Sequence, residues 1–242
     1  LLATLEMHKM VDRWGLEEGG AVAAPVDAAP PEEVEPAPLP LLVEGRLFVA
    51  QNADGGWYAV QGQEVYLPDT DRLATLLDSD AEIWAFDAKP LYRLALEQGH
   101  IGKALHFDGK LAAYLLNPSA SGYEVHSLAA EYGVHAAFAC EAAPDAGVLA
   151  GLCDTLAAAL DVMKELDGTG LLEHIRVIDV EKEYDMSIWY DERYEIKLGG
   201  TDELAYKIRY LCSILDQLSE FQAGTIDLTQ AAQKRATFQP AA

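Results

Sequence analysis

The sequence predicts an α/β protein of the α+β type, in which a mixed sheet with helices is followed by a small antiparallel sheet covered by one long helix. Between residues 41 and 160, short apolar runs of strand length alternate with stretches of helical periodicity. In the last third, three strand-like runs come first and a single long periodic helix follows. Because 50% of the 242 residues are hydrophobic, the chain can bury a substantial core.

The first part of this pattern predicts four strands and five helices. Apolar runs indicate the strands, at 46–50, 57–60, 64–67 and 83–86. Gly55 and Gly56 separate the first two and predict a hairpin. Capping residues, proline and glycine delimit the helices, which are expected from 70 and at 90–98, 110–116, 125–132 and 146–160. We expect four large residues of this part to lie in its core, namely Leu111, Tyr114, Leu115 and Leu128.

The last third predicts a second, smaller unit. Its first strands are expected at 177–180, 186–190 and 194–198. Thr201 is expected to cap a helix over 202–221. Apolar residues recur there every three or four positions, at Leu204, Ile208, Leu211, Leu215 and Leu218. This stripe must pack on the sheet, so Ile208 should be buried. Two more strands are expected at 225–229 and 236–239.

The N-terminal residues differ in composition from the rest. Residues 1–16 predict a short helix, and residues 17–40 predict an extended linker, because proline and unopposed acidic residues dominate there. The chain begins with Leu, which suggests a piece of a longer protein.

Charge and cysteine content restrict the function classes. The net charge of -23 argues against a basic stripe that would hold nucleic acid. No apolar run is long enough to predict a membrane segment, and no signal peptide is visible. Cys140, Cys153 and Cys212 form no motif and are expected to be reduced and buried. These features indicate a cytoplasmic location.

Three runs in register carry a resemblance to a known family. They are Phe86-Asp-Ala-Lys-Pro-Leu-Tyr92, Phe107-Asp-Gly-Lys-Leu-Ala-Ala-Tyr-Leu-Leu-Asn-Pro118 and Ser127-Leu-Ala-Ala-Glu-Tyr-Gly133. Residues 1–160, and 41–160 in particular, resemble the 3′–5′ exonuclease-type domain of bacterial DNA polymerase I (family A). The resemblance implies a ribonuclease H-like fold and a role in DNA replication or repair, with DNA reached through a parent polymerase.

A second resemblance covers residues 163–242. The runs Ile188–Gly199, Leu204–Leu211 and Gly224–Leu228 are similar to the C-terminal part of the FtsQ/DivIB cell-division family. That resemblance implies a division-complex protein as a partner, bound at the C-terminal strands. Together the two resemblances indicate a fusion, with the join at about 155–168, and both a natural gene fusion and an artificial joining remain open.

The exonuclease resemblance also shows what is missing. Such enzymes hold two divalent metals with converging carboxylates. Here the first strand has only Asp54 in the following turn, and Leu91 stands where an Asp is expected. Asp108 matches the pattern, and Asp145 matches it with Glu141 in place of a Tyr. We therefore interpret Asp108 and Asp145 as remnants, and expect no catalytic residues, no metal site and no cofactor; Mg²⁺ enters only if the chain is an active exonuclease.

Other residue groups have structural interpretations. Asp80 and Glu82 are expected in a solvated loop. Four histidines are expected at surface or cap positions, namely His100, His106, His126 and His135. Four aromatic residues, which could stack on bases, are expected in the core, namely Trp57, Tyr58, Trp84 and Phe86. A solvated helix face is expected to include the basic residues Arg193, Lys197, Lys207 and Arg209.

Three functions follow from these observations. The first is a non-catalytic, degenerate exonuclease-like module of a DNA polymerase I. The second is a division-complex scaffold that binds partners by strand addition at 225–228 and 236–239. The third is an active metal-dependent 3′–5′ exonuclease.

Overall fold

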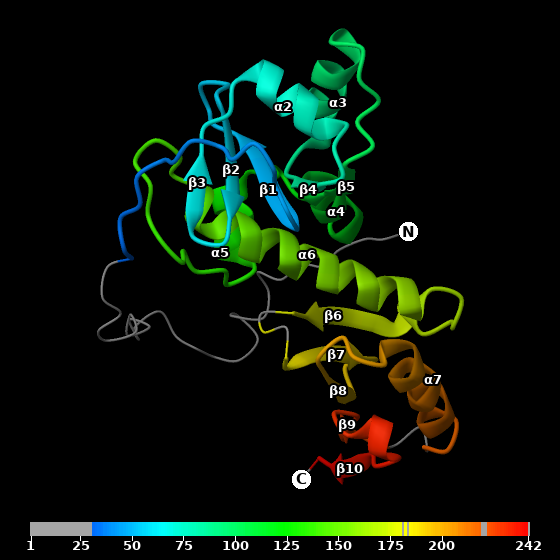
Figure 1. Cartoon of the computed structure of the whole chain (residues 1–242). Helices are drawn as coiled ribbons and strands as arrows, with labels where there is room; N and C mark the ends of the chain where they lie inside the picture. The colour runs from blue at the N-terminus through cyan, green and yellow to red at the C-terminus, as the bar shows by residue number, and fades with distance from the viewer. Residues whose placement is uncertain (1–30, 181, 183, 219–221, 242) are drawn as a thin grey trace.

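The computed structural model describes residues 31–180, 182, 184–218 and 222–241 (Figure 1). The predicted helix at 1–16 and residues 17–30 of the predicted linker lie outside the described residues. The described end of that linker lies along the first unit. There the N–H of Val34 donates to the carbonyl of Ala139 at 2.8 Å, and the N–H of Ala37 to the carbonyl of Val65 at 2.8 Å.

The first sheet is mixed, as expected, and has the strand order β3-β2-β1-β4-β5. Its strands are β1 (Arg46–Gln51), β2 (Trp57–Gln61), β3 (Glu64–Tyr66), β4 (Glu82–Ala85) and β5 (Leu105–Asp108). The first three pair antiparallel, and the predicted hairpin at Gly55 and Gly56 is confirmed. β1, β4 and β5 pair parallel. Strand β5 was not expected, because it is a short edge strand whose residues are only partly buried.

Helices cover both faces of this sheet. Alternate residues of β1 point to opposite sides, so Leu47 and Val49 enter one core and Phe48 and Ala50 enter another. The first core contains the helices α2 (Thr70–Leu77) and α3 (Ala88–Glu97). The second contains α4 (Gly109–Leu116), α5 (Val125–Glu131) and the first half of α6 (Ala146–Leu166). The result is a three-layer α/β/α unit.

Helix α4 packs through its small residues, not its large ones. Ala112 and Ala113 are buried, whereas Leu111, Tyr114 and Leu115 are about half exposed. The expectation that these three residues are core was therefore wrong, although Leu128 on α5 is buried. Close approach of α4 to α6 leaves room only for the alanine side of the helix.

The second sheet has the order β10-β9-β8-β7-β6. Its strands are β6 (Ile175–Asp179), β7 (Met186–Tyr190), β8 (Tyr194–Gly199), β9 (Gly224–Asp227) and β10 (Thr237–Pro240). Three of its pairs are antiparallel, but β8 and β9 are parallel. The sheet is thus not wholly antiparallel, because α7 (Leu204–Leu215) forms a crossover between β8 and β9.

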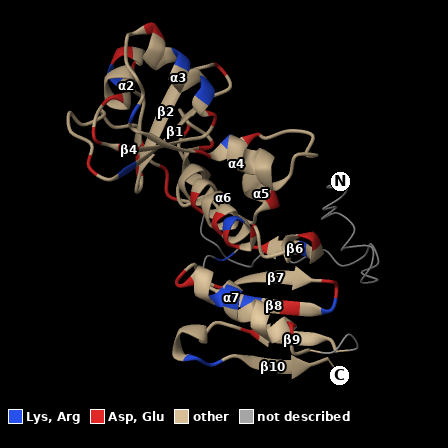
Figure 2. Cartoon of the chain, turned by 90° about the vertical axis from the view of Figure 1, so that its right-hand side faces the viewer, with Lys and Arg blue, Asp and Glu red and all other residues tan. Residues whose placement is uncertain are grey.

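Helix α7 lies against the second sheet (Figure 2). Leu204, Ile208 and Leu211 of the predicted stripe are buried, and Leu215 and Leu218 are partly buried against the same core. The helix is shorter than the expected 202–221 and is preceded by Glu203, whose φ of 50° places it in the left-handed region. Thr201 is therefore not its cap.

Helix α6 connects the two units. Its first half, through Leu156, packs in the first unit, and its second half, from Ala158 to Leu166, packs against the second sheet. The predicted join at 155–168 falls where the packing partner changes. By length and mean hydropathy (1.6) α6 is also the one described helix that could cross a membrane, but half of its apolar window is buried inside the structure. This burial is typical of a core helix.

Candidate functional site

Three parallel strands of the first unit end at the same edge of the sheet. Gln51 ends β1, Asp87 follows β4 and Asp108 ends β5. Binding and catalytic groups in open α/β sheets commonly lie at the carboxyl ends of parallel strands. This edge is therefore the candidate site. Asp87 turns the chain from β4 into α3, with a φ of 67°.

Asp108 uses both carboxylate oxygens to hold backbone groups. Its Oδ1 accepts the N–H of Leu111 at 3.1 Å, and its Oδ2 accepts the N–H of Ala88 at 3.0 Å. The first bond caps α4, and the second ties α4 to the first residue of α3. Both helix N-termini carry positive partial charge, so the carboxylate is favourably placed there. The structure thus gives Asp108 the role of a clamp between two helices.

Asp87 pairs with Lys110, a residue that was not expected at a functional site. Lys110 Nζ lies 2.8 Å from Asp87 Oδ2. This hydrogen bond, with the charges of Asp87, Glu124 and Asp108, raises the pKa of Lys110 against the opposing effect of its partial burial. The ammonium group therefore already pairs with Asp87, a carboxylate that would otherwise be available to attract a divalent cation. A signal was available, because Lys110 follows Asp108 by two residues at the start of a helix.

The other carboxylates considered above do not join Asp87 and Asp108 in a cluster of three ligands among the described residues. Asp145 precedes α6 and makes no side-chain cap bond. Its charge, together with the larger effect of burial, raises the pKa of Tyr58 on β2. Asp54 lies in the β1–β2 turn, where its Oδ1 accepts the N–H of Gly56 at 2.9 Å. Leu91 on α3 is fully buried in the core between α3 and the sheet. An apolar side chain therefore occupies the position at which the resemblance places an Asp.

These residues do not fit a two-metal site. In the part of the chain that the structure describes, no three His, Cys, Asp or Glu side chains come close enough together to hold a metal ion. Two metals would need several converging carboxylates. The described carboxylates at this edge are instead hydrogen-bonded to backbone N–H groups or to Lys110.

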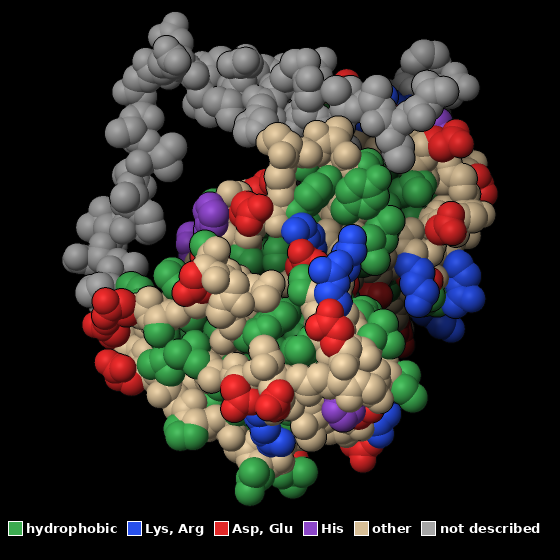
Figure 3. Space-filling model, turned by 90° about the horizontal axis from the view of Figure 1, so that it is seen from above, with side chains coloured by type: hydrophobic (Ala, Val, Ile, Leu, Met, Phe, Trp, Pro, Cys, Tyr) green, Lys and Arg blue, Asp and Glu red, His purple; other side chains and the backbone are tan. Residues whose placement is uncertain are grey.

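A hollow of about 410 Å³ lies beside the edge, between α3 and the start of β2. Its lining is Gln51, Trp57, Asp87, Lys89, Pro90, Arg93, Leu94 and Glu97. The two basic and two acidic side chains balance, so the hollow does not attract phosphate by charge alone. From above, Lys and Arg side chains lie in separate groups among acidic ones rather than in a continuous stripe (Figure 3).

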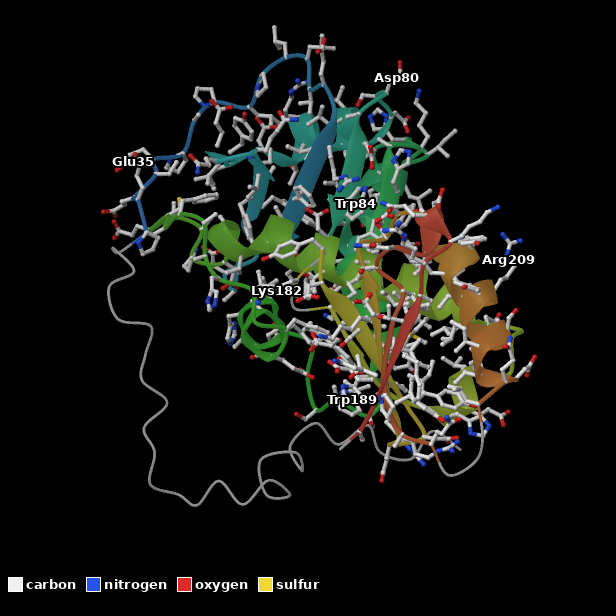
Figure 4. The ribbon with its side chains drawn as sticks, turned by 90° about the horizontal axis from the view of Figure 1, so that it is seen from below. Glu35, Asp80, Trp84, Lys182, Trp189 and Arg209 are labelled. Atoms are coloured by element: carbon white, nitrogen blue, oxygen red, sulfur yellow. The ribbon has the colours of Figure 1, made fainter. Side chains whose placement is uncertain are left out.

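The Asp80-x-Glu82 pair divides between a loop and a strand. Asp80 projects into solvent at the rim of the first unit and pairs with Lys103 (Figure 4). Glu82, expected in the loop, begins β4, and its Oε1 accepts a hydrogen bond from Trp84 Nε1 at 2.7 Å. Arg46 also contacts Glu82, and its guanidinium lies 3.8 Å from the centre of a Trp84 ring.

The expected core aromatics divide in the same way. Tyr58 and Phe86 are buried, whereas Trp57 and Trp84 are partly exposed. The guanidinium of Arg46 packs on Trp84, and the ring centres of Phe107 and Trp84 are 4.5 Å apart. Trp57 lines the hollow described above, in which basic and acidic side chains balance.

The histidines occupy surface or hydrogen-bonded positions. His100 Nδ1 lies 3.0 Å from Asp78 Oδ2, and His106 Nδ1 lies 2.7 Å from the carbonyl of Ala104. His126 and His135 are exposed. The structure brings none of them together with Asp108 as a cluster of three ligands among the described residues.

The predicted basic face of the last helix is not a single surface. Lys207 is 1% exposed, and its Nζ donates to the carbonyl of Gly200 at 2.9 Å. It lies three residues after Leu204 and four before Leu211, so it belongs to the buried stripe. Arg209 extends from α7 into solvent, as expected (Figure 4).

The cysteines are all free: Cys140 and Cys153 are buried and Cys212 is partly so. Burial raises the pKa of the Cys153 thiol, which also lies near the charge of Asp154. Burial therefore disfavours the reactive thiolate form of Cys153.

Comparison with known proteins supports the first resemblance. A family model described as DNA polymerase I, ribonuclease H-like domain, matches residues 46–142. The segment that resembles FtsQ/DivIB lies outside this match. Compared with curated proteins and with solved structures, the chain gives no match. The family match covers the three-layer unit from β1 to α5 and ends before α6.

Proposed function

We propose that the first unit is a non-catalytic exonuclease-like module of the DNA polymerase I type, acting in DNA replication or repair. The family match supplies the polymerase relationship. The observation that supports a loss of catalysis is that the Asp108 carboxylate accepts hydrogen bonds from two helix N-termini. In this proposal DNA is reached through a parent polymerase, no Mg²⁺ is needed, and the protein is cytoplasmic.

Incubation with DNA tests the proposal directly. The whole chain is mixed with 5′-labelled single-stranded DNA and either Mg²⁺ or Mn²⁺, and products are followed on a denaturing gel. We expect no stepwise 3′ shortening above the level of the Asp108→Ala variant. Metal-dependent shortening that disappears in Asp108→Ala would establish the active-exonuclease alternative instead.

A second candidate function concerns the second unit, as a division-complex scaffold of the FtsQ/DivIB type. The supporting observation is that β10 lies at the edge of the sheet and, among the described strands, pairs only with β9. An edge strand offers unpaired backbone groups to which a partner strand can add. The N–H of Ala241 donates to the carbonyl of Ala223, and alternate residues of a strand face the same side, so the N–H of Phe238 faces away from β9. Substitution of Phe238 by Pro removes this N–H from the free edge of β10. In this proposal the substitution in β10 weakens capture of a division-complex partner, whereas Gln233→Pro, which lies outside the strand, does not. Equal capture by the two variants would contradict the proposal.

The fusion interpretation is a further part of the proposal. Helix α6 continues without a break from before the expected join at 155–168 to Leu166. A natural fusion predicts one uninterrupted reading frame across this segment in the source DNA. Sequencing reads that span residues 150–170 test this, and reads that stop on either side of the segment would contradict it.

A further inference from the structure

Helix α4 presents its large apolar side chains to solvent. Leu111, Tyr114 and Leu115 are 54%, 50% and 52% exposed. Their spacing of i, i+3 and i+4 places them next to one another on one side of the helix. Monomers scatter single exposed leucines, but three adjacent large residues on one helix form a patch. We name these three residues the α4 face.

The rest of α4 is fixed, so the α4 face is held in place. Ala112 and Ala113 are buried on the other side, and α4 packs on α6. Asp108 caps the helix at its start. Helix α4 lies on the right-hand side of the first unit in Figure 1, and Figure 2, which views that side, shows α5 beside it and no described helix or strand in front of it. A fixed surface loses little conformational entropy on binding.

A tyrosine from the following loop extends this surface. The rings of Tyr114 and Tyr123 are edge to face, with centroids 6.0 Å apart. Tyr123 Oη donates to the carbonyl of Asn117 at 2.7 Å, which fixes the loop beside the helix. Aromatic residues supply contact area at low entropic cost and are enriched in binding surfaces.

The charges around the α4 face define the partner. Three carboxylates, those of Asp87, Asp108 and Glu124, act on the one lysine of the helix, Lys110. The rim at the start of α4 is therefore acidic, and the chain as a whole carries a net charge of -23. A second copy would place one acidic rim near another, which is unfavourable. A basic partner is complementary.

We propose that the α4 face is a docking surface for an amphipathic helix of another polypeptide, with apolar residues at i, i+3 and i+4 and Lys or Arg beside them. Helix recognition of this kind uses a few apolar anchors for affinity and charges for orientation. The proposal goes beyond the exonuclease-like function and does not depend on whether the chain cleaves DNA.

Peptide binding to the whole chain tests this inference. The probe is a fluorescein-labelled 18-residue peptide that has Leu at positions i, i+3, i+4 and i+7 and Lys at the other positions. Its binding is followed by fluorescence anisotropy at about 150 mM salt. We expect saturable binding that is weakened about tenfold or more by Leu111→Ser with Leu115→Ser. The matched control is Leu96→Ser, which removes a leucine that is 70% exposed on α3. It should leave binding unchanged.

Several outcomes would overturn the proposal. One is equal binding by the double variant and the control, which would show general attraction to an acidic protein. Another is equal binding of a peptide with Glu in place of Lys. A third is sedimentation showing a dimer that the double variant dissociates, because a second copy would then cover the α4 face. A fourth is binding only after removal of residues 1–30, because this chain would then be its own occupant. Unfolding curves recorded for all variants serve as the control that each variant is folded.

Discussion

Asp108 is a structural clamp, so its removal should cost stability. In Asp108→Ala the N–H of Leu111 loses its cap, which costs about 1 kcal/mol at an exposed helix start. The N–H of Ala88, whose residue is buried, loses its acceptor at an additional cost of about 1–2 kcal/mol. We therefore expect the free energy of unfolding to fall by about 2–3 kcal/mol, and Tm to fall by roughly 5–10 °C for a chain of this size.

Urea unfolding followed by tryptophan fluorescence measures this change, because Trp84 lies beside the strand that ends at Asp108. Asp108→Asn keeps one acceptor oxygen and should lose only about half as much stability. Asp80→Ala removes an exposed carboxylate of the same unit and serves as the control, with a change within about 0.5 kcal/mol. An unchanged free energy of unfolding in Asp108→Ala would refute the clamp, and lost nuclease activity beside it would assign Asp108 to catalysis.

Three further predictions concern pH, a thiol and a glycine. The N–H of Gly102 in particular holds the pKa of Asp78 below its usual value. The stability that Asp78 contributes is therefore present above about pH 4 and is lost as pH falls through its folded pKa. The free energies of unfolding of native and Asp78→Ala protein, measured between pH 2.5 and 6, should converge at the acid end. The Cys153 thiol should react with N-ethylmaleimide only after unfolding, as mass spectrometry of labelled peptides would show, because it is buried and its pKa is raised. Gly147→Ala should lower the free energy of unfolding by about 3 kcal/mol or more in urea, because the added carbon would lie 2.0 Å from the carbonyl oxygen of Phe138.

Each of these predictions has a comparison that can contradict it. A constant difference between native and Asp78→Ala protein down to pH 2.5 would show that the Asp78 contribution does not depend on its ionisation. Labelling of Cys153 at the rate of the partly exposed Cys212 in native protein would contradict its burial. Gly122→Ala is the control for Gly147, since its added carbon meets nothing within 4 Å, and equal effects at both glycines would contradict the close contact.

The sequence was sufficient for most elements and for the ribonuclease H-like relationship. The strands at 46–51 and 57–61 and the helix at 70–77 follow from local signals, namely apolar runs, a Gly-Gly turn and a cap at Asp69. Strand β5 lacked such a signal, because an edge strand buries too little to show a clear alternation. The parallel pairing of β8 and β9 also lies beyond local signals, because it depends on the path of the chain after α7.

The candidate site shows the same division between local and tertiary information. Set against the exonuclease resemblance, Leu91 and the apolar first strand led us to expect an incomplete set of metal-binding carboxylates. The tertiary structure decided what the remaining ones do, since Asp108 contacts Ala88 across 20 residues and Asp87 contacts Lys110 across 23. It also decided which side of a helix is buried. The spacing of Leu111 and Leu115 defines a face, but only the close approach of α4 to α6 turns that face outward.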